Sequence, residues 1–164
     1  GAGLPGIPIA LARPSTLLTL VEANGKKAAF LRQCEIELGM KSVQICQSRV
    51  ESIAPESLEF GIPDLIIARA FRVIGEFLEL IAPFVFSTTT VFAMKGPALQ
   101  SELEQMAGQI KSAKVSEQLL SLLASHQMKS EVLALADPNT TRQVAIFSAL
   151  SPKDIRPPAA FLQE

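Results

Sequence analysis

The strongest constraint on the fold is an alternation between short apolar runs and longer segments with helical spacing. Leu17–Val21 and Asp64–Ala68 are rich in Leu, Ile, Val and Ala, a pattern typical of strands buried on both faces of a parallel sheet. Between them, Asn24–Leu38 has apolar residues at helical spacing, with Asn24 as the expected N-cap and Gly39 as the stop signal. This alternation predicts an α/β fold around a mostly parallel sheet.

The same pattern continues along the chain. Further helices are expected at Pro5–Arg13, Ile74–Ala82 and Pro97–His126. Further strands are expected at Ser42–Cys46 and Thr90–Met94. Breaks near Gly108 and Val115 are expected in the third helix. Asp137-Pro138-Asn139 is a turn signal between Glu131–Ala136 and Gln143–Leu150, so these two strands should form a C-terminal antiparallel hairpin.

Length and composition limit the class of protein. The chain has 164 residues, 48% of them hydrophobic and 19% charged, with a net charge of -1, which excludes predominant disorder. We expect one domain over residues 1–150 and an irregular, proline-containing tail over 151–164. Residues 13–49 carry a net charge of +3, which suits a polyanionic partner but also a solvated helix face. No apolar stretch is long enough to predict a transmembrane helix.

The cysteines and the single histidine do not suggest a reactive centre. Cys34 and Cys46 are expected to be reduced core residues, as in cytoplasmic proteins. His126 is expected to be exposed in the last turn of a helix. The sequence therefore predicts no metal site.

Candidate binding residues follow the expected strands, because parallel sheets bind ligands at the carboxyl ends of their strands. Gly1 and Gly3 precede a helix, where glycines let backbone N–H groups approach a ligand. Glu22 ends the next strand, about 20 residues later, where a carboxylate can accept hydrogen bonds from ribose hydroxyls. Together they favour a nucleoside-containing cofactor; the alternative is a structural glycine turn and a solvated glutamate.

Five segments also carry a family resemblance: Gly1–Pro8, Gly25–Arg32, Gln47–Glu51, Arg69–Phe71 and Met94–Gly96. In this order and spacing they resemble the RsmG (GidB) family of bacterial 16S ribosomal RNA guanine-N7 methyltransferases, which use S-adenosyl-L-methionine. The resemblance implies a Rossmann-like class I methyltransferase sheet. The family's first strand, its N-terminal helical region and a preceding glycine have no counterpart here, so we expect an N-terminally truncated domain whose sheet lacks its first strand.

The resemblance implies a role for each matching residue at the cofactor. The methionine end would be lined by Gly1, Gly3 and Leu4. Glu22 would hold the ribose, and Val50 and Glu51 would flank the adenine. Arg69 would bind at the edge between cofactor and target as the catalytic residue, with its aliphatic stem buried.

The expected partner is 16S ribosomal RNA or the small ribosomal subunit. Lys26, Lys27 and Arg32 share a helix and could bind phosphates, which would make RNA affinity fall with salt. The resemblance adds Lys95, near the RNA or the mouth of the site. It also implies a cytoplasmic protein that is monomeric when intact and has no membrane partner.

The expected chemistry suits this inventory of side chains. Guanine N7 has a lone pair and no proton, so its methylation requires positioning but no obligatory general base. Two alternatives remain at this point. One is an inactive remnant or weak RNA-binding module. The other is a nicotinamide-dependent dehydrogenase, which the continuation Leu4–Pro8 and the segment Arg69–Phe71 disfavour.

Overall fold

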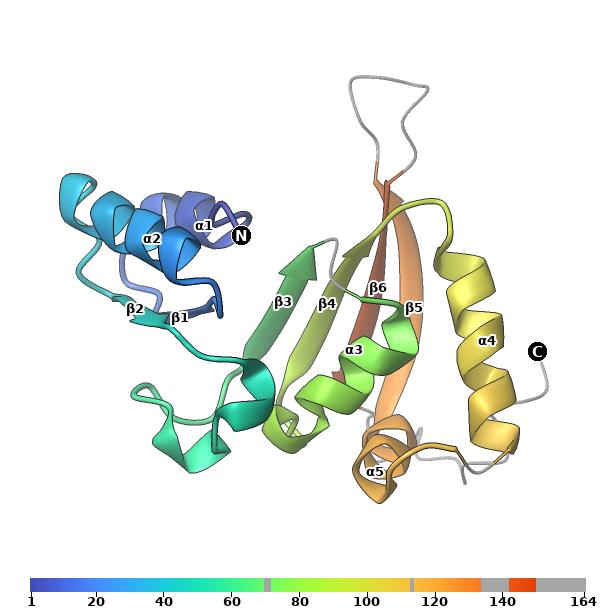
Figure 1. The fold of residues 1–164 in the computed structure, drawn as a ribbon. Coiled ribbons are helices and arrows are strands. Elements are labelled where there is room, and N and C mark those ends of the chain that lie inside the picture. The colour runs from blue at the N-terminus through green and yellow to red at the C-terminus, as the bar shows by residue number, and fades with distance from the viewer. Residues whose placement is uncertain (70–71, 113, 134–141, 150–164) are drawn as a thin grey trace. The chain divides into compact units, whose positions relative to one another are not determined.

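The computed structural model describes residues 1–69, 72–112, 114–133 and 142–149 (Figure 1). The chain divides into two compact units, Gly1–Ile62 and Pro63–Glu164. Each unit has its own sheet and its own apolar core. The single domain expected over residues 1–150 stays a prediction, and the tail at 151–164 lies outside the described residues.

The first unit pairs two short parallel strands with two helices. Its elements are α1 (Gly6–Ala12), β1 (Leu18–Val21), α2 (Gly25–Glu37), β2 (Val43–Cys46) and the 3-10 helices η1 (Val50–Ser52) and η2 (Pro55–Ser57). Strands β1 and β2 run parallel, from the pair Leu18–Val43 to the pair Val21–Cys46. The expected strands and helices of this region are therefore confirmed to within one or two residues.

Local chemistry explains where α2 begins. The side chain of Asn24 accepts hydrogen bonds from the backbone nitrogens of Lys26, at 3.0 Å, and Lys27, at 3.1 Å. An N-cap of this kind satisfies donors that the first helical turn leaves without partners. Cys34 and Cys46 are both free and half-buried, in agreement with the expectation.

The second unit contains a four-stranded sheet with helices packed on it (Figure 1). Its elements are β3 (Leu65–Arg69), α3 (Ile74–Ile81), η3 (Ala82–Phe84), β4 (Thr90–Lys95), α4 (Leu99–Lys111), α5 (Glu117–Ser125), β5 (His126–Leu133) and β6 (Arg142–Ala149). The strand order is β3-β4-β6-β5; β3 and β4 are parallel, whereas β6 is antiparallel to both of its neighbours. The C-terminal hairpin is thereby confirmed, while its expected turn at residues 137–139 lies outside the described residues.

Burial of one face of α3 organises the core of the second unit. Ile74 and Leu78 are fully buried and belong to one cluster with Val91 of β4, Leu119 of α5 and Phe147 of β6. Burying side chains of this size is the dominant stabilising term in such a core.

The break near Val115 and the end near His126 expected for the third helix are confirmed, but the break at Gly108 and the start of the next strand at Glu131 need correction. Gly108 does not break α4, which continues to Lys111, because an exposed glycine costs only about 1 kcal/mol in a helix that packs through its other face. The break lies at residues 112–116, near the expected Val115. The next helix ends at Ser125, so β5 begins at His126 and not at Glu131.

The expected exposure of His126 is also wrong. The residue is 1% exposed, with Nε2 lying 2.9 Å from the Thr89 carbonyl oxygen and Nδ1 lying 2.9 Å from Ser125 Oγ. Its ring is a satisfied polar group of the core, as buried polar groups generally are.

The strands together give an α/β architecture that is parallel apart from the C-terminal hairpin. Within the described ranges, β1 and β3 each pair with a single strand. The missing first strand stays a prediction. No helix in the part of the chain that the structure describes is both long and apolar enough to cross a membrane.

Candidate functional site

Glu22 stands where β1 ends. Its backbone nitrogen still donates to the Cys46 carbonyl oxygen, at 3.0 Å, so the strand pairing with β2 extends to this residue. Its carboxylate accepts a hydrogen bond from the backbone nitrogen of Asn24 at 2.8 Å, and its other oxygen contacts the nitrogen of Gly1. The side chain is 13% exposed. A half-buried carboxylate with one oxygen held by a backbone N–H and the other paired with an ammonium group is a fixed acceptor for hydroxyl donors.

The glycine loop next to Glu22 has a backbone that requires glycine at one position. Gly3 has a φ of +74°, and a Cβ there would lie 2.3 Å from Ile7 Cδ1 and 2.9 Å from Leu31 Cδ2. The left-handed backbone strongly favours glycine, and any other residue would also require the Ile7 and Leu31 side chains to shift. Leu4 is exposed beside it. Partial burial, and then the positive charge of Lys27, lower the pKa of the Gly1 ammonium.

The residues expected to flank an adenine follow the neighbouring strand. Val50 is half-buried and Glu51 is exposed, and both lie on η1 shortly after β2. Because β1 and β2 are parallel and Val21 pairs with Cys46, these residues and Glu22 follow adjacent strand ends at one edge of the small sheet. The first unit therefore brings the glycine loop, the acid and the η1 residues to the same edge.

Exposed basic residues cover part of α2. Lys26, Lys27 and Arg32 are all exposed, and Arg32 Nη1 donates to Gln47 Oε1 at 3.0 Å. Lys26 and Lys27 also line a shallow depression of about 300 Å³ together with Gly1, Ala2 and Phe30. This face can meet an anion without a large desolvation cost.

A second hollow of the first unit lies away from these residues. It measures about 340 Å³ and lies near the amino ends of β1 and β2, lined by residues such as Ala10, Pro14, Met40 and Val43. None of the site residues expected from the sequence lines it.

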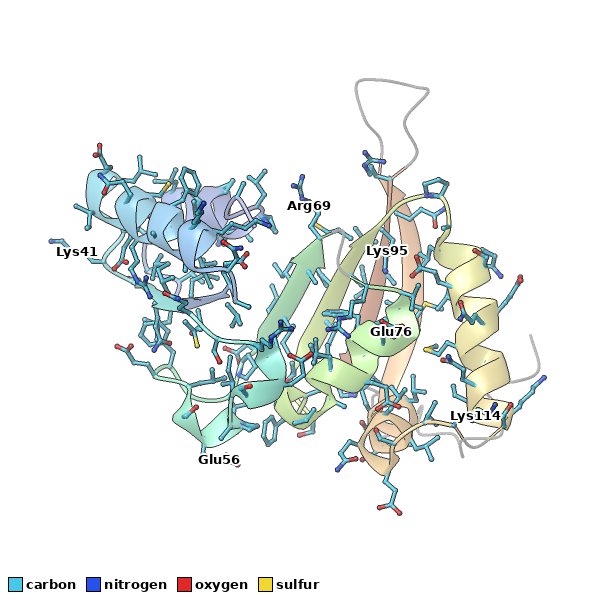
Figure 2. All side chains as sticks on the ribbon, in the orientation of Figure 1. Lys41, Glu56, Arg69, Glu76, Lys95 and Lys114 are labelled. Atoms are coloured by element: carbon cyan, nitrogen blue, oxygen red, sulfur yellow. The ribbon has the colours of Figure 1, made fainter. Side chains whose placement is uncertain are left out.

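In the second unit, Arg69 and Lys95 end the two parallel strands β3 and β4 (Figure 2). Arg69 pairs in register with Met94, so it lies beside the residue that precedes Lys95. Arg69 as a whole is exposed at the end of a strand with one described neighbour, and burial of its aliphatic stem stays a prediction. Its guanidinium is thus accessible to a ligand.

Lys95 lies in a different environment. Its side chain is 7% exposed, its ammonium lies 2.8 Å from Glu102 Oε2, and it donates a hydrogen bond to the Arg72 carbonyl oxygen. A contact with RNA would require this side chain to move, and stays a prediction. Sequence reasoning missed Glu102; the available signal was an acidic residue in the first turn of a helix, seven residues after Lys95.

The structure thus defines two sets of candidate residues, one in each unit. That both sets line one pocket stays a prediction. In the described ranges, no three or more His, Cys, Asp and Glu side chains are grouped as a metal site would require.

Comparison with known proteins places these features in one family. The family model for GidB, rRNA small subunit methyltransferase G, matches residues 1–132. A ribosomal RNA small subunit methyltransferase G from Hahella chejuensis is 38% identical over 106 residues, which cover 65% of this chain and 47% of the relative. The chain spans about half the length of the curated relatives it matches.

Solved structures of methyltransferases share the fold. A precorrin-6y C5,15-methyltransferase from Geobacter metallireducens gives a TM-score of 0.62 at 10% identity, over 92% of this chain and 76% of that one. The M. jannaschii TYW2 in complex with AdoMet gives a TM-score of 0.57 at 14% identity, over 88% of this chain and 63% of that one. With a class I methyltransferase fold and a family match over most of its length, the chain belongs to the GidB family, rRNA small subunit methyltransferase G.

Proposed function

We propose that this chain acts in S-adenosyl-L-methionine-dependent methylation of N7 of a guanine in 16S ribosomal RNA. The observation that carries the proposal is the family match over residues 1–132, with Glu22 and Arg69 at carboxyl ends of parallel strands. Relatives bear the name ribosomal RNA small subunit methyltransferase G, and the structurally similar TYW2 was solved with AdoMet. The partner is then 16S ribosomal RNA or the small subunit in the cytoplasm, met by a monomeric protein.

The first unit offers groups that suit this cofactor. The backbone at Gly3 is free of a Cβ, and the Glu22 carboxylate is a fixed acceptor that can take hydrogen bonds from ribose hydroxyls. Gly1, Leu4, Val50 and Glu51 complete the set that would hold the methionine and adenine ends. When bound, S-adenosylmethionine would supply a sulfonium methyl group to the N7 lone pair; the C–S bond would be exchanged for a C–N bond, the positive charge would pass to the base and no proton would be released.

The remaining residues act on the target nucleotide. Arg69 presents an exposed guanidinium with several N–H donors, which orient the nucleotide or its phosphate beside the methyl group. Lys26, Lys27 and Arg32 bind phosphates of the surrounding RNA. Lys95 approaches the RNA only if its side chain leaves Glu102.

Calorimetry and a methyl-transfer assay test the proposal. S-adenosylmethionine should bind and NAD should not. Label from tritiated S-adenosylmethionine should enter unmodified 16S RNA or small subunits, and nuclease digestion followed by mass spectrometry should recover N7-methylguanosine. Binding of NAD alone, or label at another atom, would contradict the proposal.

A further inference from the structure

A buried ion pair lies at the end of β4, in the same part of the second unit as Arg69. Lys95 ends β4 and Glu102 lies in the first turn of α4, with the two charged groups 2.8 Å apart. Their side chains are 7% and 17% exposed, so the pair is largely removed from solvent. Pairs of this kind contribute little net stability compared with apolar packing, although removal of one partner leaves an uncompensated buried charge.

Both members of the pair also bind the backbone of a third segment. Lys95 donates to the carbonyl oxygen of Arg72, and Glu102 Oε2 accepts from the backbone nitrogen of Ile74 at 2.7 Å. Ile74 opens α3, whose N-cap residue Val73 has no side chain able to cap it. Glu102 therefore supplies the missing acceptor, with a negative charge at the positive end of the helix.

The two backbone positions bound by the pair lie close to Arg69 in the sequence. Only two residues of sequence separate Arg69 from Arg72, and Arg69 pairs in register with Met94, the neighbour of Lys95. The backbone around Arg69 is thus held by the β3–β4 pairing. The two charged groups hold the chain at Arg72 and Ile74, three and five positions further along the sequence.

We propose that Lys95 and Glu102 are positioning residues, which fix the carboxyl end of β4 beside Arg69 and the backbone of Arg72 and Ile74, so that the Arg69 guanidinium meets the substrate in a single orientation. This inference rests on the proposed function, in which Arg69 acts on the target nucleotide. While the pair is intact, neither side chain touches the substrate, so this role and the RNA contact proposed for Lys95 exclude each other. Their effect reaches the reaction through the backbone at Arg72 and Ile74.

The test compares Glu102→Gln with two matched variants that remove the same charge. Glu79→Gln removes another part-buried carboxylate, which accepts from Ser116 N at 2.7 Å and from Ser116 Oγ. Glu76→Gln removes an exposed carboxylate 3.9 Å from the Arg72 guanidinium. All variants are assayed at a temperature well below their unfolding midpoints, with active sites counted by S-adenosylmethionine binding.

For Glu102→Gln we expect kcat to fall at least tenfold, while the Kd for S-adenosylmethionine changes less than about threefold. Glu79→Gln and Glu76→Gln should keep kcat within about twofold. Lys95→Met should resemble Glu102→Gln, and Lys95→Arg should restore part of the missing rate. Equal decreases in Glu102→Gln and Glu79→Gln would overturn the inference, because destabilisation alone would then account for both.

A measurement on the free protein separates this inference from the proposed function. In NMR spectra, Glu102→Gln should speed amide exchange at Ile74 and shift the Arg69 resonances, and Glu79→Gln should do neither. If the unaltered protein has no methyltransferase activity but Glu102→Gln gives these NMR changes, the proposed function is refuted and the positioning role of Lys95 and Glu102 still stands. Unchanged Arg69 resonances would refute the positioning role whatever the activity.

Discussion

His126 Nε2 lies 2.9 Å from the carbonyl oxygen of Thr89, although 37 positions separate the two residues in the chain. Both residues are fully buried, and the bond joins the start of β5 to the residue before β4. It holds the outer strand of the hairpin against the parallel part of the sheet at one end.

The first prediction concerns this contact. His126→Ala should lower the free energy of unfolding by roughly 2–4 kcal/mol, because it opens a cavity and removes a buried hydrogen bond. Denaturant unfolding followed by circular dichroism measures the change. Gln127→Ala, at the exposed next position, should cost under about 0.5 kcal/mol. Equal effects at the two positions would contradict the structural role of the imidazole.

The second prediction concerns the N-cap of α2. Asn24→Ala should destabilise the protein by about 1 kcal/mol, because the backbone nitrogens of Lys26 and Lys27 lose their acceptor. Asn24→Ser keeps an oxygen within reach and should recover most of that stability. The same unfolding experiment compares both variants, and an alanine variant as stable as the serine variant would exclude the cap.

The third prediction concerns the ribose acceptor of the proposed cofactor site. Glu22→Ala should weaken S-adenosylmethionine binding at least tenfold, which corresponds to about 1.4 kcal/mol. Glu37→Ala, an exposed acid at the end of α2, is the matched control and should bind like the unaltered protein. Calorimetry gives both affinities. Unweakened binding by Glu22→Ala would remove this carboxylate from the site.

The fourth prediction concerns Arg69. Arg69→Ala should abolish methyl transfer and leave the unfolding midpoint nearly unchanged, because the side chain is exposed at the end of β3. Arg13→Ala removes another exposed arginine and should leave transfer intact. Turnover at the normal rate in the Arg69 variant would exclude the residue from catalysis.

The fifth prediction concerns the basic face of α2. Alanine at Lys26, Lys27 or Arg32 should weaken RNA binding and make it less sensitive to salt. The slope of the logarithm of the binding constant against the logarithm of the salt concentration should become shallower by up to about 0.7–0.9 for each phosphate that the variant no longer neutralises. Lys111→Ala, an exposed lysine at the end of α4, is the control and should preserve both quantities. Fluorescence anisotropy at several salt concentrations measures them. An unchanged slope in the α2 variants would place the RNA elsewhere.

The features that could be predicted from the sequence are those whose interacting residues lie close together along the chain. Asn24 is recognisable as a cap because its partners lie two and three residues away. The apolar runs of β1 and β3 are also recognisable locally, since both consist of residues typical of buried strands. Glu22 could be placed because it follows such a run.

The start of β5 and the partners of Lys95 depend on distant residues. The stretch from His126 alternates polar Gln127, Lys129 and Glu131 with other residues, but few of those are apolar, and its pairing with β6, where His126 lies opposite Ala149, is not evident from that pattern. Glu102 meets Ile74 across 28 positions, a separation at which no local spacing rule applies. Burial of His126 and Lys95 is therefore a tertiary outcome, and local sequence patterns could not reveal it.

The sheet of the first unit consists of two strands of four residues each, and the described part of β1 has β2 as its one neighbour. A two-stranded sheet of this length has little stability of its own. Under the proposed function, a ligand clasped by the glycine loop and Glu22 would add its binding energy to the folding of this unit. At a ligand concentration of about 100 times Kd, this linkage stabilises the folded state by about 2.7 kcal/mol. The folded population of the first unit would therefore rise and fall with the concentration of S-adenosylmethionine.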